Sequence, residues 1–419
     1  MKIFWSLLTT LLIIILFGCT SKESAVEEQP SNDLMDDPNL KKIFEMKQEE
    51  RLNNFAFDIY KEILRKEDGN MVVSPFSIST AMAMAYGGSG EETKNQMSKT
   101  LMFDPDMNVF HKEFNEHSKK IEKLAGDDLE LNIANGMWIQ HDYPFLQSYI
   151  ETIQKYYGSV LHEADFKSDQ EKIRQEINKW VEERTNHKIQ ELIEQGILVE
   201  DTRMVLVNAI YFLSNWYEEF EKDLTHKRNF HLNDNDKVEV EFMNKESSFK
   251  YYEDNLAQVI EIPYSGKDFS MVLMLPNENT PLTDFEARLD TDMYNDYINN
   301  LVEQEVQLLL PKFKMRFHTN LEEILSSMGM PLAFSDRADF SRMTDEHDLK
   351  IDRVIHQAFI EVDEEGTEAA AATAVTIIRK TAIEDDKIIF RADRPFKFFI
   401  KENESNTILF MGRVINPEE

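Results

Sequence analysis

The sequence predicts one large domain of the mixed α+β class, and three observations support this prediction. Segments with apolar residues at helical spacing are interspersed with segments that are continuously apolar or alternate with period two. The 419 residues are 42% hydrophobic and 30% charged, with only 13 Gly and 12 Pro, as in a folded chain rather than a collagen-like or disordered one. Neither a long linker nor an internal repeat interrupts residues 45–415.

The first residues predict export. Lys2 precedes an apolar run at 3–17 that is too short for a membrane-spanning helix and is typical of a secretory signal, so we expect residues 1–18 to be a signal peptide. The run ends in Leu-Phe-Gly-Cys, which resembles the lipobox of bacterial lipoproteins, although Phe17 is bulkier than usual there. Ordinary signal cleavage is the alternative.

The lipobox resemblance implies that Cys19, the only cysteine, carries acyl chains and tethers the protein to a membrane of the bacterial cell envelope, the outer membrane. Polar residues and two prolines follow it, which is typical of a flexible linker. We therefore expect a lipidated flexible tether at 19–44 and the folded domain at 45–419.

Two stretches have the pattern of amphipathic helices. From Leu52, apolar residues recur every three or four positions as far as Ile63, which predicts a helix lying on a core. Residues 168–171 have the Ser-x-x-Glu form of a capping box. We therefore expect a second helix to begin at Ser168.

Three strand patterns follow. Residues 204–213 are nearly all apolar, which predicts a strand at the centre of a sheet, covered on both faces. Apolar residues alternate between Val306 and Phe317 but change register at Pro311, which suggests one strand bent at the proline. Residues 396–400 and 408–410 flank a polar turn, so we expect the chain to end in a hairpin.

Charge and motifs exclude several classes of function. The 46 basic and 78 acidic residues give a formal net charge of −32, which repels nucleic acids. No Cys/His cluster has zinc-ligand spacing, and no Gly-x-Ser-x-Gly nucleophile elbow is present. The sequence therefore predicts no catalytic residue, no metal site and no cofactor, and the protein is not expected to be an enzyme.

Residues 364–381 form an unusual stretch. Its four consecutive alanines favour a helical turn, because alanine is the best helix former. From Thr373, however, the residues are β-branched, and a polar break follows at 384–386, which favours an extended segment. One face of such a segment carries no charge and could enter a core; it comprises Thr367, Ala369, Ala371, Thr373, Val375 and Ile377.

This stretch resembles the hinge and reactive-centre loop of serpins. Further segments in the same order resemble signatures of that family: residues 70–78 (NMVVSPFSI), 202–216 with NAIYF, 334–341 (FSDRADFS), and 393–417 with DRPF and FMGRVINP. On these motifs the chain is identified as a member of the serpin family from Lys47 onward. The resemblance implies three β-sheets, about eight or nine helices, and an exposed reactive-centre loop at about 364–386.

The resemblance also implies a suicide-substrate inhibitor of serine proteases, with cysteine proteases as a further target class. The protease attacks the loop, and the arm upstream of the cut inserts into the central sheet while the enzyme is still held as an ester. A small residue such as Thr367 at the first inward position is typical of inhibitory serpins. The alternative is a non-inhibitory binding or chaperone protein on the same fold. We expect a monomer with no nucleic-acid partner.

Family spacing places the cleaved bond at Lys380-Thr381, with Arg379 as the alternative residue before the bond. Either gives a basic bait side chain, which suits a trypsin-like protease; the two basic residues could instead keep an apolar loop soluble. The resemblance assigns the hinge to Glu364, Glu365, Gly366, Thr367, Glu368, Ala369, Ala370, Ala371, Ala372 and Thr373.

Two control regions also follow from the resemblance. The shutter, a buried polar network beneath the sheet, comprises Ser74, Ser77, Asn208 and His356. The breach, where the arm first enters, comprises Trp216, Lys312 and Glu364. A Lys312–Glu364 pair would hold the loop out or guide it, or contribute almost nothing if it lies at the surface.

Overall fold

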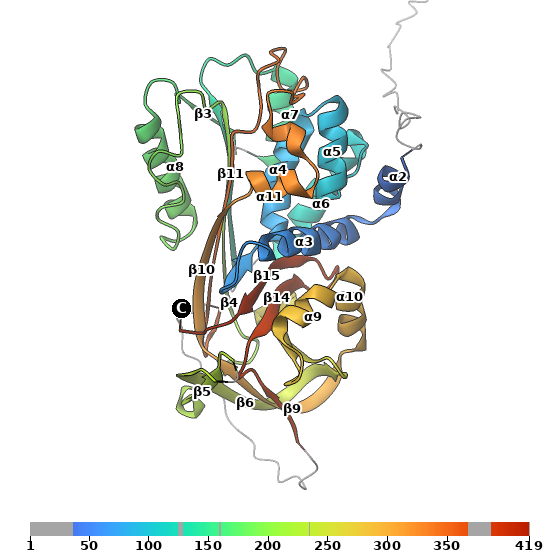
Figure 1. Ribbon diagram of the computed structural model, residues 1–419, viewed down its shortest axis with the longest axis vertical. Helices are drawn as coiled ribbons and strands as arrows, with labels where there is room; N and C mark the ends of the chain where they lie inside the picture. The colour runs from blue at the N-terminus through green and yellow to red at the C-terminus, as the bar shows by residue number, and fades with distance from the viewer. Residues whose placement is uncertain (1–36, 125–128, 159–160, 234, 368–386, 419) are drawn as a thin grey trace, which may run out of the picture.

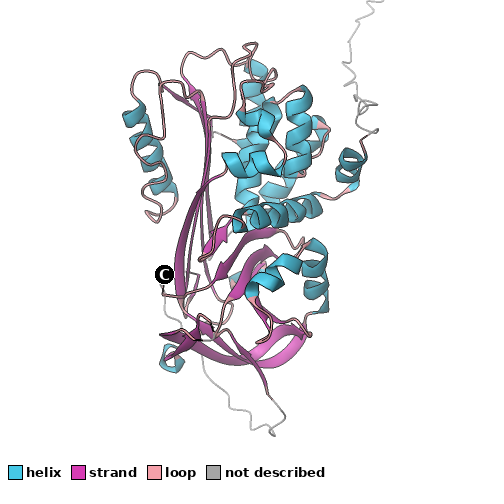
Figure 2. Cartoon of the chain, viewed as in Figure 1, coloured by secondary structure: helices cyan, strands magenta, loops and turns pink. Residues whose placement is uncertain are grey.

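The structure, a computed structural model, describes residues 37–124, 129–158, 161–233, 235–367 and 387–418. In this part of the chain, helices and strands build one α+β body with two hydrogen-bonded sheets (Figure 1, Figure 2). The long strands of the six-stranded sheet run along the longest axis of the molecule (Figure 1).

The six-stranded sheet has the order β10-β11-β12-β4-β2-β3. Strand β4 lies in its interior, antiparallel to β2 and β12 and parallel to β11. This confirms the expectation of a central strand at 204–213. The strands are β2 (Leu129–Gln140), β3 (Leu161–Ala164), β4 (Met204–Asn215), β10 (Phe313–Asn320), β11 (Arg353–Val362) and β12 (Gly366–Thr367).

The nine-stranded sheet has the order β1-β15-β14-β8-β7-β6-β9-β13, with β5 on β6. Strand β6 pairs with β5 and β9 over most of its length and with β7 at its end, so it joins two smaller sheets. With the six-stranded sheet, these are the three expected sheets. The strands are β1 (Met71–Val73), β5 (His226–His231), β6 (Lys237–Glu253), β7 (Ala257–Pro263), β8 (Phe269–Pro276), β9 (Val302–Pro311), β13 (Ile388–Arg391), β14 (Phe396–Glu402) and β15 (Ile408–Val414).

The described residues form 10 α-helices, slightly more than the eight or nine expected. Helix α8 lies on one face of the six-stranded sheet, and the helices around α4 lie on the other (Figure 1). None of the helices in the described ranges is long and apolar enough to cross a bilayer. They are α2 (Pro38–Glu45), α3 (Gln48–Leu64), α4 (Pro75–Gly88), α5 (Glu91–Leu101), α6 (Met107–Leu124), α7 (Gln147–Tyr157), α8 (Gln170–Arg184), α9 (Leu282–Arg288), α10 (Thr291–Asn300) and α11 (Glu322–Met328).

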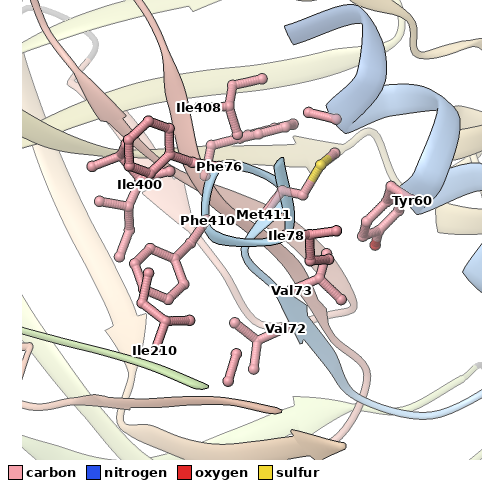
Figure 3. Packing of buried hydrophobic residues seen from close by; sticks show 14 of the residues in the cluster. Tyr60, Val72, Val73, Phe76, Ile78, Ile210, Ile400, Ile408, Phe410 and Met411 are labelled. Atoms are coloured by element: carbon pink, nitrogen blue, oxygen red, sulfur yellow. The ribbon is translucent and has the colours of Figure 1, made fainter. Parts of the chain in front are cut away.

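The main core lies between the two sheets. Ile210 of β4 and Phe410 of β15 come from different sheets and pack together with Phe76 and Ile78 of α4 (Figure 3). A second apolar cluster fills the space between α8 and the opposite face of the six-stranded sheet. Strand β4 is therefore buried on both faces, which explains its nearly continuous apolar sequence.

Two sequence predictions need correction. Asp169, not Ser168, caps α8, because its carboxylate accepts the N–H of Lys172. Residues 302–320 are two strands in different sheets rather than one bent strand: β9 ends at Pro311 and β10 begins at Phe313. Between them, the N–H of Lys312 donates to Glu241. The helix from Leu52 and the C-terminal hairpin are confirmed as α3 and β14–β15.

The folded body begins before residue 45. Helix α2 overlaps the end of the predicted tether, and its Leu40 and Ile43 are buried. Asp37 caps the helix and forms an ion pair of 2.5 Å with Lys99 of α5. Because the apolar face of α2 packs on the domain, residues 37–44 belong to the folded body. Cys19 and residues 1–36 lie outside the described residues.

Candidate functional site at the hinge

The first hinge residues form a short strand wedged into one end of the six-stranded sheet. Thr367 of β12 pairs with Val362 of β11 on one side and with Ser214 of β4 on the other. Its side chain is fully buried, and its hydroxyl lies 2.8 Å from the hydroxyl of Tyr264. We call this end of the sheet, where β4 ends and β12 begins, the hinge end.

Gly366 is required here by close packing. A Cβ at this position would lie 2.1 Å from the carbonyl oxygen of Ser214. Its φ is not in the left-handed region, so close packing rather than backbone conformation accounts for this glycine. The missing side chain lets β12 approach β4 closely enough to pair with it.

A tight turn precedes β12. Asp363 donates its N–H to the carbonyl of Gly366, while its carboxylate accepts the N–H groups of Glu365 and Gly366. Trp216 holds the turn to β4, since its backbone N–H donates to Glu365 and its indole N–H donates to the Asp363 carbonyl, both at 2.9 Å. The hinge therefore leaves β11 in a fixed direction.

An aromatic stack supports the buried hydroxyl of Thr367. The rings of Trp216 and Tyr264 are nearly parallel, with centroids 4.8 Å apart. Both side chains are buried. Thr367 thus enters a site that is already lined by large rings and offers one hydroxyl as a partner.

Two ion pairs cross the same turn. The ammonium of Lys312 lies 2.9 Å from the buried carboxylate of Glu364, and Lys222 pairs with Glu365. Burial is the largest single influence and raises the pKa of Glu364, but hydrogen bonds from Lys312, Thr225 and the backbone, together with the charge of Lys312, outweigh it and lower the pKa below its usual value. The Lys312 side chain is 34% exposed, so solvent screens this pair and its contribution to stability is small.

A buried polar network lies further along β4 and β11. The Asn208 amide donates to the hydroxyl of Ser77 at 2.5 Å and to the side-chain carbonyl of Asn135. The Ser77 hydroxyl donates to the same oxygen of Asn135 at 3.0 Å. Ser74 caps α4 by accepting the N–H of Ser77, and its hydroxyl donates to the carbonyl of Leu409. The network ties α4, β2, β4 and β15 together.

His356 of β11 completes the network as a neutral imidazole. Its Nε2 accepts the N–H of Ser74 at 3.3 Å, so its Nδ1–H donates to the side-chain carbonyl of Asn208. Burial, with a smaller contribution from the charge of His318, lowers the pKa of His356 to about 3. The His356–Asn208 hydrogen bond is a direct side-chain link between the two strands that flank β12.

Beyond β12, β11 and β4 pair directly. Their parallel register runs from Arg353 opposite Val205 to Phe359 opposite Tyr211. The sheet is therefore parted at the hinge end, where Thr367 lies between the two strands, and closed over the rest of its length.

Comparisons with known proteins agree with this architecture. A family model described as "Serpin (serine protease inhibitor)" matches residues 50–417. The chain belongs to the serpin family. Serpins are generally inhibitors of proteases rather than catalysts.

The serpin relatives span nearly the whole chain. An uncharacterized serpin-like protein of Methanosarcina acetivorans is 38% identical over 97% of this chain and 96% of its own length. Leukocyte elastase inhibitor of Sus scrofa is 39% identical over 87% of this chain and 97% of its own. The native-state crystal structure of tengpin, a thermophilic serpin, matches with a TM-score of 0.80 and 31% identity over 90% of this chain and 94% of that one.

The structure brings together the predicted shutter residues Ser74, Ser77, Asn208 and His356 in one network. It also places Trp216, Lys312 and Glu364 around one turn. Of the predicted hinge, residues 364–367 are described; the other hinge residues and the proposed reactive bond lie outside the described ranges. They are Glu368, Ala369, Ala370, Ala371, Ala372, Thr373, Arg379, Lys380 and Thr381.

Sequence reasoning missed three residues of this serpin site. Asn135 completes the shutter network, Tyr264 binds the hydroxyl of Thr367, and Asp363 shapes the turn. Asn135 is the polar residue within the otherwise apolar run 133–139, and this interruption is the one sequence signal that could have singled it out. The roles of Tyr264 and Asp363 depend on contacts across the fold, and nothing local in the sequence marks them.

Proposed function

We propose that this protein is a suicide-substrate inhibitor that traps trypsin-like serine proteases by inserting its reactive-centre arm between β11 and β4. The observation that carries the proposal is the position of Thr367, already paired with both strands at the hinge end. Further along the sheet, within the described part of the chain, these edges of β11 and β4 pair with each other from Arg353–Val205 to Phe359–Tyr211, and a further strand could enter between them.

The register of Thr367 defines how the arm would insert. Because β12 is antiparallel to both neighbours, each step along the arm is one step back along β4 and β11. Continuing this register by six residues would place Thr373 between Asn208 and His356. Their hydrogen bond would open, and the Thr373 hydroxyl, which can both donate and accept, could partner the two side chains it separates.

The exchange of strand pairings favours insertion. One parallel ladder between β11 and β4 would be replaced by two antiparallel ladders, which are more stable per residue. If about a dozen new hydrogen bonds contribute ~1 kcal/mol each, insertion releases on the order of 10 kcal/mol. This matches the whole stability of a typical protease domain, so the bound enzyme can be distorted. Its ester then persists because small displacements of catalytic groups lower rates strongly.

The choice of target follows from the bait residues. Cleavage at Lys380-Thr381, or after Arg379, presents a basic side chain to a pocket with a buried carboxylate, as in trypsin-like enzymes. Cysteine proteases are a second proposed class, and no cofactor is needed.

The direct test is to mix the purified domain with trypsin. A covalent band that survives boiling in detergent, with loss of protease activity, is the expected result. Cutting of the loop with full retention of trypsin activity would instead support a binding or chaperone role on the serpin fold.

We also propose that Cys19 carries a lipid that anchors the inhibitor in a bacterial envelope, in the outer membrane. The Leu-Phe-Gly-Cys motif after a short apolar run supports this proposal. Expression in bacteria fed with labelled palmitate should label the wild type but not Cys19→Ala. Equal labelling of both proteins, or of neither, would contradict the anchor.

A further inference from the structure

A pocket of about 840 Å³ lies at the opposite end of the six-stranded sheet from the hinge. It is bounded by the residues that precede β4 and β11 and by the end of β10. We call it the foot pocket. Its apolar wall includes Ile197, Phe334 and Ile351, and its carboxylates are Asp201, Glu322, Glu323, Asp336, Asp348 and Asp352.

The three cationic side chains of the foot pocket are already engaged. Lys350 pairs with Asp336 at 2.5 Å. Arg353 donates to the backbone carbonyl of Asp352, and Arg203 donates to backbone carbonyls of its own loop. Acidic groups thus outnumber basic ones at this site.

Two of the six carboxylates remain available for a new cation. Asp352 and Glu322 accept backbone N–H groups, while Asp336 and Glu323 pair with lysines. By contrast, the ion pair of the 97% exposed Asp201 side chain within the described residues is a loose one to Arg203, at 3.9 Å, and the charge of Lys350 acts on Asp201 only from further away. Among the described residues, the contact to the Asp348 carboxylate comes from the hydroxyl of Tyr143, a neutral donor.

If the register of β12 is continued along an inserted arm, the end of the arm reaches this pocket. Thr367 lies opposite Ser214, so ten residues further along an inserted arm Ile377 would lie opposite Met204, the first residue of β4. Arg379 and Lys380 would then pass beyond the strand to the level of residues 201–202. The distance from Thr367 to Lys380 in an extended arm is ~43 Å, at ~3.3 Å per residue.

We propose that the foot pocket is the seat of Ile378 and Lys380, at the end of the arm, after insertion. This inference rests on the insertion proposed above. These two side chains share one face of an extended arm, with Arg379 on the other face; the apolar wall suits Ile378, and the carboxylates of Asp201 and Asp348 suit Lys380. Charge and length of the arm therefore match this site, and a second protein partner is not required to fill it.

Binding of the arm end in the foot pocket would prolong the lifetime of the protease complex. While the protease is intact, the Lys380 side chain is held by the carboxylate of the enzyme's own specificity pocket. Insertion removes the Lys380 side chain from the specificity pocket of the enzyme, and the carboxylates of the foot pocket become its new partners. The enzyme-bound arm is thereby held at its end, which slows its return to a conformation in which the ester can be hydrolysed.

The first test compares the lifetime of the trypsin complex in two variants. Asp201→Asn/Asp348→Asn removes the two available carboxylates, and Asp345→Asn/Glu346→Gln removes two exposed charges from the same loop region outside the pocket. We expect the first variant to form the complex but to release active trypsin at least about threefold faster than the control. Equal release rates would overturn the seat, whereas a wild type that forms no complex would refute the inhibitory function instead.

A second test needs no variant. The protein is clipped with a lysine-specific protease, treated with a carbodiimide that joins amines to carboxylates with loss of water, and mapped by mass spectrometry. We expect Lys380 to be linked to Asp201 or Asp348 in the clipped protein and not in the intact one. Linkage elsewhere, or none, in clipped protein that has gained heat resistance would overturn the seat while leaving insertion intact.

Discussion

Thr367 is the residue on which insertion depends most directly. Its side chain is fully buried against Tyr264, so Thr367→Arg would place a guanidinium there without a partner. Burying an unpaired charge costs several kcal/mol, which slows insertion enough for the ester to be hydrolysed first. We expect the variant to be cut by trypsin with at least tenfold less covalent complex than the wild type.

The matched control is Thr367→Ser, which keeps the hydroxyl and should still trap the enzyme. Complex yield is read from detergent gels at equal protease and inhibitor concentrations. A Thr367→Arg protein that trapped trypsin as well as the serine variant would contradict the hinge argument.

His356 gives the shutter a pH dependence. Its folded pKa of about 3 lies below the ordinary value of 6.5, so between these values the unfolded chain binds a proton that the folded chain does not. The contribution of His356 to stability is therefore constant above pH 6.5 and falls as pH decreases toward 3. At pH 5, the loss is on the order of 2 kcal/mol relative to pH 7.

The measurement is the denaturant midpoint of the uncleaved protein at pH 7 and pH 5, for the wild type and for His356→Gln. The wild type should lose more stability than the variant over this interval. Equal losses would show that His356 takes up its proton in the folded state and is not the neutral imidazole inferred here.

At the scale of residues, the family resemblance pointed to side chains that lie together in the structure, and it left out side chains that only the fold brings together. The resemblance grouped Ser74, Ser77, Asn208 and His356, and their network is present. Tyr264 precedes a loop after β7, far from the hinge in sequence, and its contact with Thr367 arises from the packing of one sheet on the other. Such contacts leave no local pattern to detect.

At the scale of elements, the edges of β4 and β11 should accept any strand of the right sequence. A free peptide of residues 367–378 can displace Thr367 of the chain from the hinge end, adopt the register of β12 and add a strand between them. We expect incubation with an excess of this peptide to raise the melting temperature and to reduce complex formation with trypsin by more than half. The occupied path can then no longer admit the arm.

The control peptide carries arginine in place of its first threonine and should have little effect. If the unmodified peptide changed neither the melting temperature nor the yield of complex, the β11–β4 edge would not be the site of insertion.

Elements with a strong local pattern were predictable, and their partners were not. The apolar run of β4 indicated a buried central strand because both of its faces are covered. The alternation on either side of Pro311 indicated strands but not that β9 and β10 belong to different sheets, since period two says nothing about which neighbour a strand pairs with. Helix α2 was assigned to the tether because its single short apolar face is diluted by charged residues.

At the scale of the whole molecule, the six-stranded sheet is open at the hinge end, where Thr367 separates β4 from β11, and closed along the rest of these two strands. Composition and periodicity supported only a large α+β body; the resemblance added the serpin fold with three sheets, which the serpin relatives confirm, and the order of the strands comes from the structure. Strand order depends on contacts between distant segments, which one sequence does not reveal. The central claim is that the closed part of the sheet opens to admit the arm.

The most direct measurement of that claim is the melting temperature before and after the reactive-centre loop is clipped by a catalytic amount of trypsin. Insertion on the order of 10 kcal/mol predicts a rise of about 12 °C in the clipped protein. A clipped protein that melts at the temperature of the intact one would contradict insertion and leave only the shared serpin fold.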